Sequence, residues 1–122
     1  DTKLKRLTGH NRLIEETTFE ELKNILVEGR YRIPTLQQVL EKIDGKVLLN
    51  VELKGKNTAI PTATILKQYL SDSQSDIKKL IVSSKNWKEL TLFKNLGTNI
   101  PIGVLSNYNI FLEETYLMNN NK

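Results

Sequence analysis

The sequence predicts an α/β fold in which parallel strands alternate with helices. Three apolar stretches, near residues 47–53, 79–83 and 100–105, have the length and composition of strands. Segments with helical apolar spacing separate them, and this alternation is typical of right-handed βαβ units. Two architectures are compatible: a doubly wound sheet, or part of a β/α barrel. A complete barrel takes about 250 residues, so a chain of 122 residues with three strands cannot close one by itself.

The first part of the chain is predicted to be polar and irregular, followed by a helix. Residues 1–16 carry a turn signal at Thr8–Asn11. Thr17 or Thr18 is expected to open the helix, and Thr18 precedes Glu21 at the spacing of a capping box. Gly29 is the predicted end, and residues 30–33 form a link. The apolar stripe of this helix comprises Phe19, Leu22, Ile25 and Leu26.

A second helix is predicted after Pro34, which restricts Ile33 to an extended conformation. Thr35 is its expected cap, and Asp44–Gly45 its end. Its apolar stripe comprises Leu36, Val39, Leu40 and Ile43.

The remaining elements follow the strand at 47–53. Next come a helix, a turn at 71–75, the strand at 79–83, a helix opened by Ser84 or Asn86 and closed by Gly97, and the strand at 100–105. A last helix is predicted over Tyr108–Met118. The first helix should bury Ile65, Leu66, Tyr69 and Leu70, and the second Trp87, Leu90, Phe93 and Leu96.

Composition narrows the possible functions. The net charge of +4 suits anionic ligands such as phosphate esters, although a solvated lysine-rich surface is the simpler explanation. The lysines are not interleaved with aromatic residues, so no nucleic-acid partner is predicted. The absence of cysteine excludes disulfides and thiolate chemistry, but it assigns no compartment. No stretch approaches the roughly 18 apolar residues of a membrane span.

The stretch VLLNVELKG, residues 47–55, places polar groups on an apolar strand. Asn50, Glu52 and Lys54 alternate with apolar residues and therefore share one face. Glu52 and Lys54 are about 6.6 Å apart along the strand. From the residues alone, the simplest explanation is an exposed ion pair worth about 0–1 kcal/mol.

Four motifs carry a resemblance to a known family: DTKLKRLTG, TTFEELKNI, RIPTLQQVLEKI and LLNVELKG. In this order and spacing they resemble the glycerophosphodiester phosphodiesterase family. Asp1 matches the Asp of that family's His-Asp pair, with Leu4 and Arg6 at the expected offsets. Residues 33–36 and 52–54 match its Ile-Pro-Thr-Leu and Glu-Leu-Lys motifs. The resemblance is clear over residues 1–55 and compatible over 80–107.

The resemblance implies a β/α (TIM-type) barrel enzyme that hydrolyses glycerophosphodiesters to an alcohol and sn-glycerol 3-phosphate with a divalent metal, Ca²⁺ or Mg²⁺. It implies that Glu52 is a metal ligand and Lys54 a catalytic residue at the phosphate, while Asp1 and Asn50 can line the site. Residues 1–122 then form an incomplete barrel domain. Residues 1–46 precede barrel strand four, and residues 47–122 contain the βα units through strand six.

The family also uses catalytic histidines and a Glu-x-Asp metal-binding pair that this chain does not contain. We expect them upstream of residue 1, in a longer polypeptide, and we expect the 122-residue chain alone to be inert. His10 is predicted to be an exposed loop residue. Ser83 and Ser84 are predicted to be a polar lumen residue or a helix cap, because no nucleophile elbow surrounds them.

Two further expectations concern association and function. An open slice of a barrel exposes sheet edges, so self-association is expected. The alternative function is a non-catalytic α/β domain that binds a partner or an anionic ligand.

Overall fold

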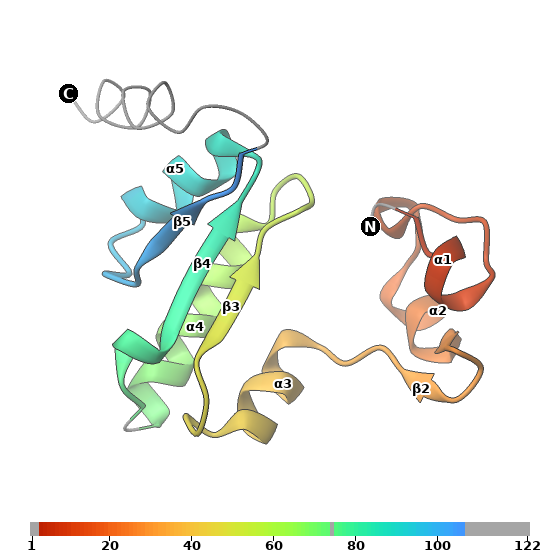
Figure 1. Cartoon of the computed structure of the whole chain (residues 1–122), viewed down its shortest axis with the longest axis horizontal. Helices are drawn as coiled ribbons and strands as arrows, with labels where there is room; N and C mark the ends of the chain where they lie inside the picture. Colours follow the sequence, from red (N-terminus) through yellow and green to blue (C-terminus); the bar gives the residue numbers. More distant parts are fainter. Residues whose placement is uncertain (1–2, 74, 107–122) are drawn as a thin grey trace. The chain divides into compact units, whose positions relative to one another are not determined.

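A computed structural model describes residues 3–73 and 75–106 (Figure 1). The chain divides into two compact units, residues 1–41 and 42–122. None of the described helices is long and apolar enough to cross a membrane.

The N-terminal unit contains short elements: α1 (Lys5–Thr8), the 3₁₀ helix η1 (Ile14–Glu16), α2 (Phe19–Asn24), β1 (Leu26–Val27) and β2 (Tyr31–Arg32). The helical turns α1 and η1 lie where the sequence predicted irregular structure. Gly9 ends α1 in the left-handed conformation, with φ of 77°. Leu4, which is buried, donates its backbone N–H to the carbonyl of Arg12 at 3.0 Å and so closes the loop between α1 and η1.

The predicted capping box of α2 is confirmed. The Thr18 hydroxyl accepts from the backbone N–H of Glu21, and the Glu21 carboxylate accepts from the backbone N–H of Thr18 at 2.9 Å. The same carboxylate lies 2.6 Å from a guanidinium nitrogen of Arg12. These interactions, the Thr18 backbone hydrogen bond first, lower the pKa of Glu21 from its ordinary 4.5 to about 2.

The prediction of a helix continuing through Leu26 was wrong. The helix ends at Asn24, and Leu26–Val27 pair antiparallel with Tyr31–Arg32 in a hairpin. Glu28 and Gly29 both take positive φ, 50° and 70°, at the turn. Gly29 therefore serves the hairpin and not a helix end. Phe19, placed in the buried stripe from the sequence, is 57% exposed, whereas Ile25 is buried as expected.

The second predicted helix is confirmed as α3 (Leu36–Ile43), which spans the boundary between the two units. Thr35 caps it as expected: its hydroxyl accepts from the backbone N–H of Gln38, and the Gln38 side chain accepts from the backbone N–H of Thr35. Leu40 is its most buried residue. Asp44 and Gly45 end the helix with positive φ.

The C-terminal unit is built on a parallel sheet of β3 (Leu49–Glu52), β4 (Leu80–Ser84) and β5 (Ile102–Val104), in the order β3-β4-β5. The crossovers contain α4 (Ala59–Asp72), followed by the 3₁₀ turn η2 (Ile77–Lys79), and α5 (Trp87–Asn95). Two right-handed crossovers in the same direction place both helices on one face, and Figure 1 shows them behind the sheet. Within the described strands the order does not reverse, as a doubly wound sheet would require at its switch point.

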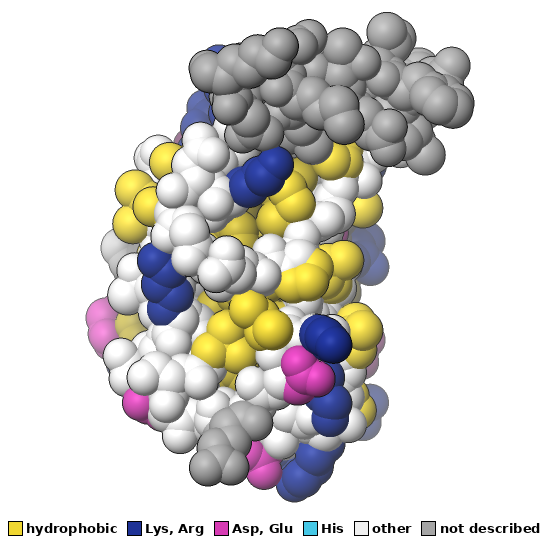
Figure 2. Space-filling view, turned by 90° about the vertical axis from the view of Figure 1, so that its left-hand side faces the viewer, with side chains coloured by type: hydrophobic (Ala, Val, Ile, Leu, Met, Phe, Trp, Pro, Cys, Tyr) yellow, Lys and Arg dark blue, Asp and Glu magenta, His cyan; other side chains and the backbone are white. Residues whose placement is uncertain are grey.

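The core of this unit lies between the sheet and its two helices. Val82, Leu66, Leu90 and Phe93 are fully buried there. The buried face of α4 comprises Ala59, Thr62, Ala63 and Leu66, because small side chains allow a helix to approach a sheet closely. The predicted face was shifted, since the flanking larger residues Ile65, Tyr69 and Leu70 are only half-buried. Figure 2 shows hydrophobic side chains that reach the surface on the side of this unit where α5 and β5 lie.

The predicted strand positions are confirmed with small shifts. The first begins at Leu49, so Val47 and Leu48 precede it and are exposed. The second runs from Leu80 to Ser84, and Asn86 caps α5 as one of the two predicted candidates. The helix predicted over Tyr108–Met118 lies outside the described residues.

Candidate active site

One face of the sheet carries the polar residues that the sequence singled out. Helices α4 and α5 cover the opposite face. The register places Glu52 of β3 beside Ser83 of β4, and Ser83 beside Gly103 of β5. Paired residues of neighbouring strands project to the same side, and a Cβ built on Gly103 would meet the Cβ of Ser83 at 3.6 Å. Side-chain size therefore decreases across this row, from Glu52 to Ser83 and then to Gly103, which has no side chain.

Glu52 and Lys54 lie at the carboxyl end of β3, and their side chains meet. The ammonium nitrogen of Lys54 is 3.6 Å from a carboxylate oxygen of Glu52. The Glu52 side chain is 32% exposed and that of Lys54 is 54% exposed. A pair this open to water contributes little to stability, but both charged groups remain accessible to a ligand.

Asn50 lies one step down the same face and is joined to the next strand. The hydroxyl of Ser83, which is buried, donates to the side-chain oxygen of Asn50 at 2.9 Å. Ser83 is thus a polar residue of the sheet face, as expected, with its hydroxyl proton directed at an amide. Ser84 faces the other way, toward the helices.

Two further contacts fix the loop that follows β3. The Ser84 hydroxyl donates to the backbone carbonyl of Leu53 at 2.6 Å. The Glu89 carboxylate, on α5, accepts from the backbone N–H groups of Asn57 at 2.7 Å and Ala59 at 2.9 Å. Sequence reasoning missed Glu89. The spacing from Asn86 to Glu89 fits a local helix cap, and no sequence signal links Glu89 to a loop about thirty residues upstream.

The described residues do not form a metal site by themselves. Glu52 offers the carboxylate oxygens that a hard divalent cation prefers. Residues 3–73 and 75–106 contain no group of three or more His, Asp or Glu side chains that could hold a metal ion together. Among the described residues, Glu52 is therefore a single carboxylate donor and does not form a metal site by itself.

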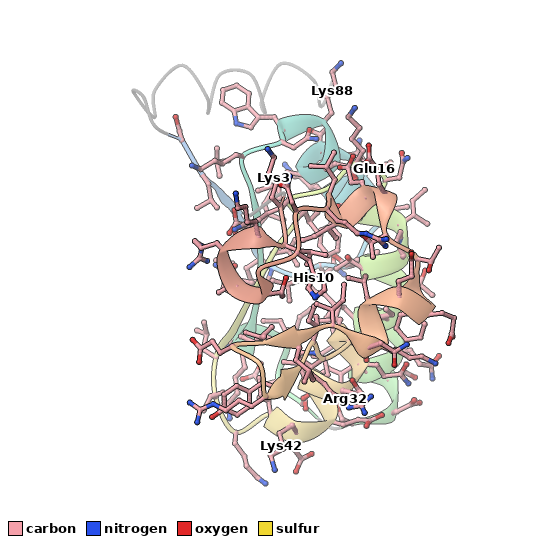
Figure 3. All side chains as sticks on the ribbon, turned by 90° about the vertical axis from the view of Figure 1, so that its right-hand side faces the viewer. Lys3, His10, Glu16, Arg32, Lys42 and Lys88 are labelled. Carbon is pink, nitrogen blue, oxygen red and sulfur yellow. The ribbon has the colours of Figure 1, made fainter. Side chains whose placement is uncertain are left out.

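Two other residues considered from the sequence, Asp1 and His10, belong to the N-terminal unit. Asp1 is outside the described residues. His10 lies in the exposed loop after α1, as predicted, and its backbone N–H bonds to the Thr8 hydroxyl at 3.2 Å (Figure 3).

Comparison with known proteins finds a family match and similar curated proteins. Residues 1–118 match the family described as glycerophosphoryl diester phosphodiesterase. The chain is 28% identical over 116 residues to a protein of Bacillus subtilis (strain 168) provisionally named glycerophosphodiester phosphodiesterase YhdW, covering 89% of this chain and 47% of that protein. It is 30% identical over 127 residues to a glycerophosphodiester phosphodiesterase of Bacillus altitudinis, covering 96% of this chain and 51% of that protein.

The chain spans about half the length of these curated relatives. The family match covers both units, from the first motif recognised in the sequence to beyond β5. The family implies a TIM-barrel-like fold, with which the parallel order β3-β4-β5 agrees. This chain belongs to the glycerophosphoryl diester phosphodiesterase family.

Proposed function

We propose that this chain is the central part of a metal-dependent phosphodiesterase that hydrolyses glycerophosphodiesters to an alcohol and sn-glycerol 3-phosphate. The observation that carries the proposal is the Glu52–Lys54 pair at the carboxyl end of β3, on the sheet face opposite the helices. Catalytic residues of β/α barrels lie at this end of the strands. The family relationship supplies the substrate class, and β3, β4 and β5 correspond to barrel strands four, five and six.

In this proposal Lys54 acts on the reacting phosphodiester. Hydrolysis breaks a P–O bond with water, and negative charge increases on the phosphoryl oxygens in the transition state. The Lys54 ammonium lies 3.6 Å from a carboxylate oxygen of Glu52, and in this proposal it stabilises that charge. Glu52 would be one ligand of a Ca²⁺ or Mg²⁺ ion, which when bound would also neutralise phosphate charge.

The other predicted residues are proposed to line the site and not to take part in the reaction. Asn50, bonded to Ser83, lines the sheet face below Glu52. Asp1 is proposed to line the same site. The histidines and the Glu-x-Asp pair used by the family would come from the remainder of the natural gene product, the polypeptide that contains this chain in the cell.

The decisive experiment measures release of sn-glycerol 3-phosphate from glycerophosphocholine and glycerophosphoethanolamine by the natural gene product. We expect activity that EDTA abolishes and added Mg²⁺ or Ca²⁺ restores. Glu52→Gln should lower kcat/KM about 100-fold or more, because it removes one charged ligand. Glu41→Gln, at an exposed position of α3, is the matched control and should leave kcat/KM unchanged. Wild-type activity in Glu52→Gln would contradict the proposed role.

A second measurement concerns the 122-residue chain alone. It contains one proposed metal carboxylate and none of the family's histidine motifs, so we expect no turnover of either substrate. EDTA-sensitive turnover by the pure chain would refute this. The intact mass of the natural gene product should also exceed the chain's 14.0 kDa. A product of 14.0 kDa that binds glycerol phosphate without hydrolysing diesters would favour the alternative, a non-catalytic binding domain.

Self-association is a further part of the proposal. The parallel sheet has β3 and β5 at its edges among the described strands. Open strand edges pair readily with other chains. We expect the isolated 122-residue chain to form oligomers, and a monodisperse monomer in analytical ultracentrifugation would contradict the partial-barrel fold.

A further inference from the structure

We infer that Glu89 is the positioning residue of the proposed active site, acting through the loop that carries Lys54. The inference rests on the proposed function, in which Glu89 has no assigned role. Glu89 lies in the first turn of α5, and its carboxylate reaches the start of α4. It is 9% exposed, which is unusual for a glutamate.

The contacts of Glu89 are directed at the backbone. One carboxylate oxygen accepts from Asn57 N–H at 2.7 Å and the other from Ala59 N–H at 2.9 Å. Ala59 is the first residue of α4, whose 14-residue length places a positive dipole end at this point. A buried carboxylate here is stabilised by two charge-assisted hydrogen bonds and by the helix dipole. Both donors are backbone N–H groups, which remain when the side chain of Asn57 or Ala59 is changed. The contact therefore depends on the side chain of Glu89.

The loop between β3 and α4 is held at both ends. At its start the Ser84 hydroxyl binds the Leu53 carbonyl. At its end the Glu89 carboxylate binds two N–H groups, one of them on Asn57, which takes the left-handed φ of 59°. Asparagine adopts this conformation more readily than most other residues that carry a side chain. Within the loop, the Thr58 hydroxyl donates to the Gly55 carbonyl at 3.0 Å.

Lys54 is the first residue beyond the Leu53 anchor. Loss of the Glu89 contacts would remove the two hydrogen bonds to Asn57 and Ala59, and so would loosen the α4 end of the segment from Lys54 to Thr58. The Lys54 side chain is more than half exposed, so its ammonium is directed mainly by its backbone and by Glu52. A displacement of about 1 Å at a reacting group can cost about 100-fold in rate. The expected effect of Glu89 is therefore kinetic as well as structural.

The test is a double-mutant cycle in the natural gene product, assayed on glycerophosphocholine. Glu89→Gln keeps the size of the side chain but replaces one acceptor oxygen by an NH₂ group that faces a backbone donor. We expect kcat to fall about 10-fold or more, with KM changed less than about threefold. In the Lys54→Met background the same substitution should cost less than about threefold, because Glu89 acts through Lys54.

Hydrogen–deuterium exchange gives a second, activity-independent measurement. The amides of Asn57 and Ala59 should exchange at least about 10-fold faster in Glu89→Gln, and this increase should exceed that of the amides in the paired strands β3 and β4. Glu41→Gln, exposed on α3, should change neither kinetics nor exchange.

The outcomes separate the inference from the proposed function. A wild-type protein without diesterase activity would overturn the proposed function, and exchange would then decide whether Glu89 fixes the loop. An active wild type with an equally active Glu89→Gln would overturn the inference alone. Equal losses from Glu89→Gln in the wild-type and Lys54→Met backgrounds would also overturn it, because they indicate a general stability effect.

Discussion

The hydroxyl of Ser84, at the end of β4, lies 2.6 Å from the backbone carbonyl oxygen of Leu53, the residue that follows β3. Both residues are buried. Leu53 also donates its own N–H to the Ser83 carbonyl at 2.8 Å, which extends the parallel pairing beyond β3. The chain is therefore fixed from two sides immediately before Lys54.

Ser84→Ala should destabilise the C-terminal unit and loosen this junction. The substitution removes the donor to a buried carbonyl and the acceptor for the Asn86 N–H, which lies 2.8 Å from the hydroxyl. Unsatisfied buried groups cost about 1–3 kcal/mol, and the free energy of unfolding in urea should fall by that amount. Ser71→Ala, at an exposed position of α4, is the control and should change it by less than about 0.5 kcal/mol. Equal effects of the two substitutions would contradict the assigned role.

Glu21 should make the free energy of unfolding of the N-terminal unit depend on pH in the acidic range. Its pKa is lowered from 4.5 to about 2 in the folded chain, so its contribution is fully present above pH about 5. It should be lost progressively as the pH falls toward 2, when the folded carboxylate takes up a proton. Glu21→Gln should remove this part of the pH dependence in denaturation curves recorded between pH 2 and 6.

NMR titration of the Glu21 carboxyl carbon can separate the two causes of its lowered pKa, the hydrogen bond from Thr18 and the interaction with Arg12. Arg12→Ala should raise the pKa only part of the way to 4.5, because the Thr18 N–H still donates to the carboxylate. A full return to 4.5 in Arg12→Ala would show that the ion pair and not the cap dominates.

Gly45 and Gly97 provide a matched pair for separating backbone strain from steric contact. Both have left-handed φ, 64° and 67°, so alanine at either position costs about 1–2 kcal/mol. A Cβ on Gly45 would lie 2.8 Å from the Ser75 hydroxyl oxygen, whereas a Cβ on Gly97 would have no described atom within 4 Å apart from those of Gly97 and its two chain neighbours. Ser75 would have to turn away and lose its 2.9 Å hydrogen bond to the Tyr69 hydroxyl.

Gly45→Ala should therefore reduce the free energy of unfolding by about 1 kcal/mol more than Gly97→Ala does. Adding Ser75→Ala to each variant should abolish the difference, since the contact is then absent. A difference that survives in the Ser75→Ala background would mean that the backbone at Gly45 is strained for another reason.

The sequence was most informative where neighbouring residues alone decide the structure. The sequence predicted the capping box at Thr18, the helix cap at Thr35, the alternation that places Asn50, Glu52 and Lys54 on one face, and the three parallel strands. Each depends on side chains a few positions apart, whose geometry is set by the helix or strand period. The same local motifs, read in order, pointed to the family that the comparison confirmed.

Tertiary structure decided the contacts between distant segments. Only the register of β3 against β4 brings Ser83 to Asn50 and Ser84 to Leu53. Only the packing of α5 beside the start of α4 brings Glu89 to two backbone donors about thirty residues away. The apolar pattern also predicted a helix through Leu26. In the structure Leu26–Val27 pair with Tyr31–Arg32 in a hairpin, and the helical pattern gives no sign of this pairing with a later segment. The helix or strand repeat determines which face of an element a residue occupies. Which distant residue it then contacts depends on how whole elements pack together, and no short stretch of sequence specifies that packing.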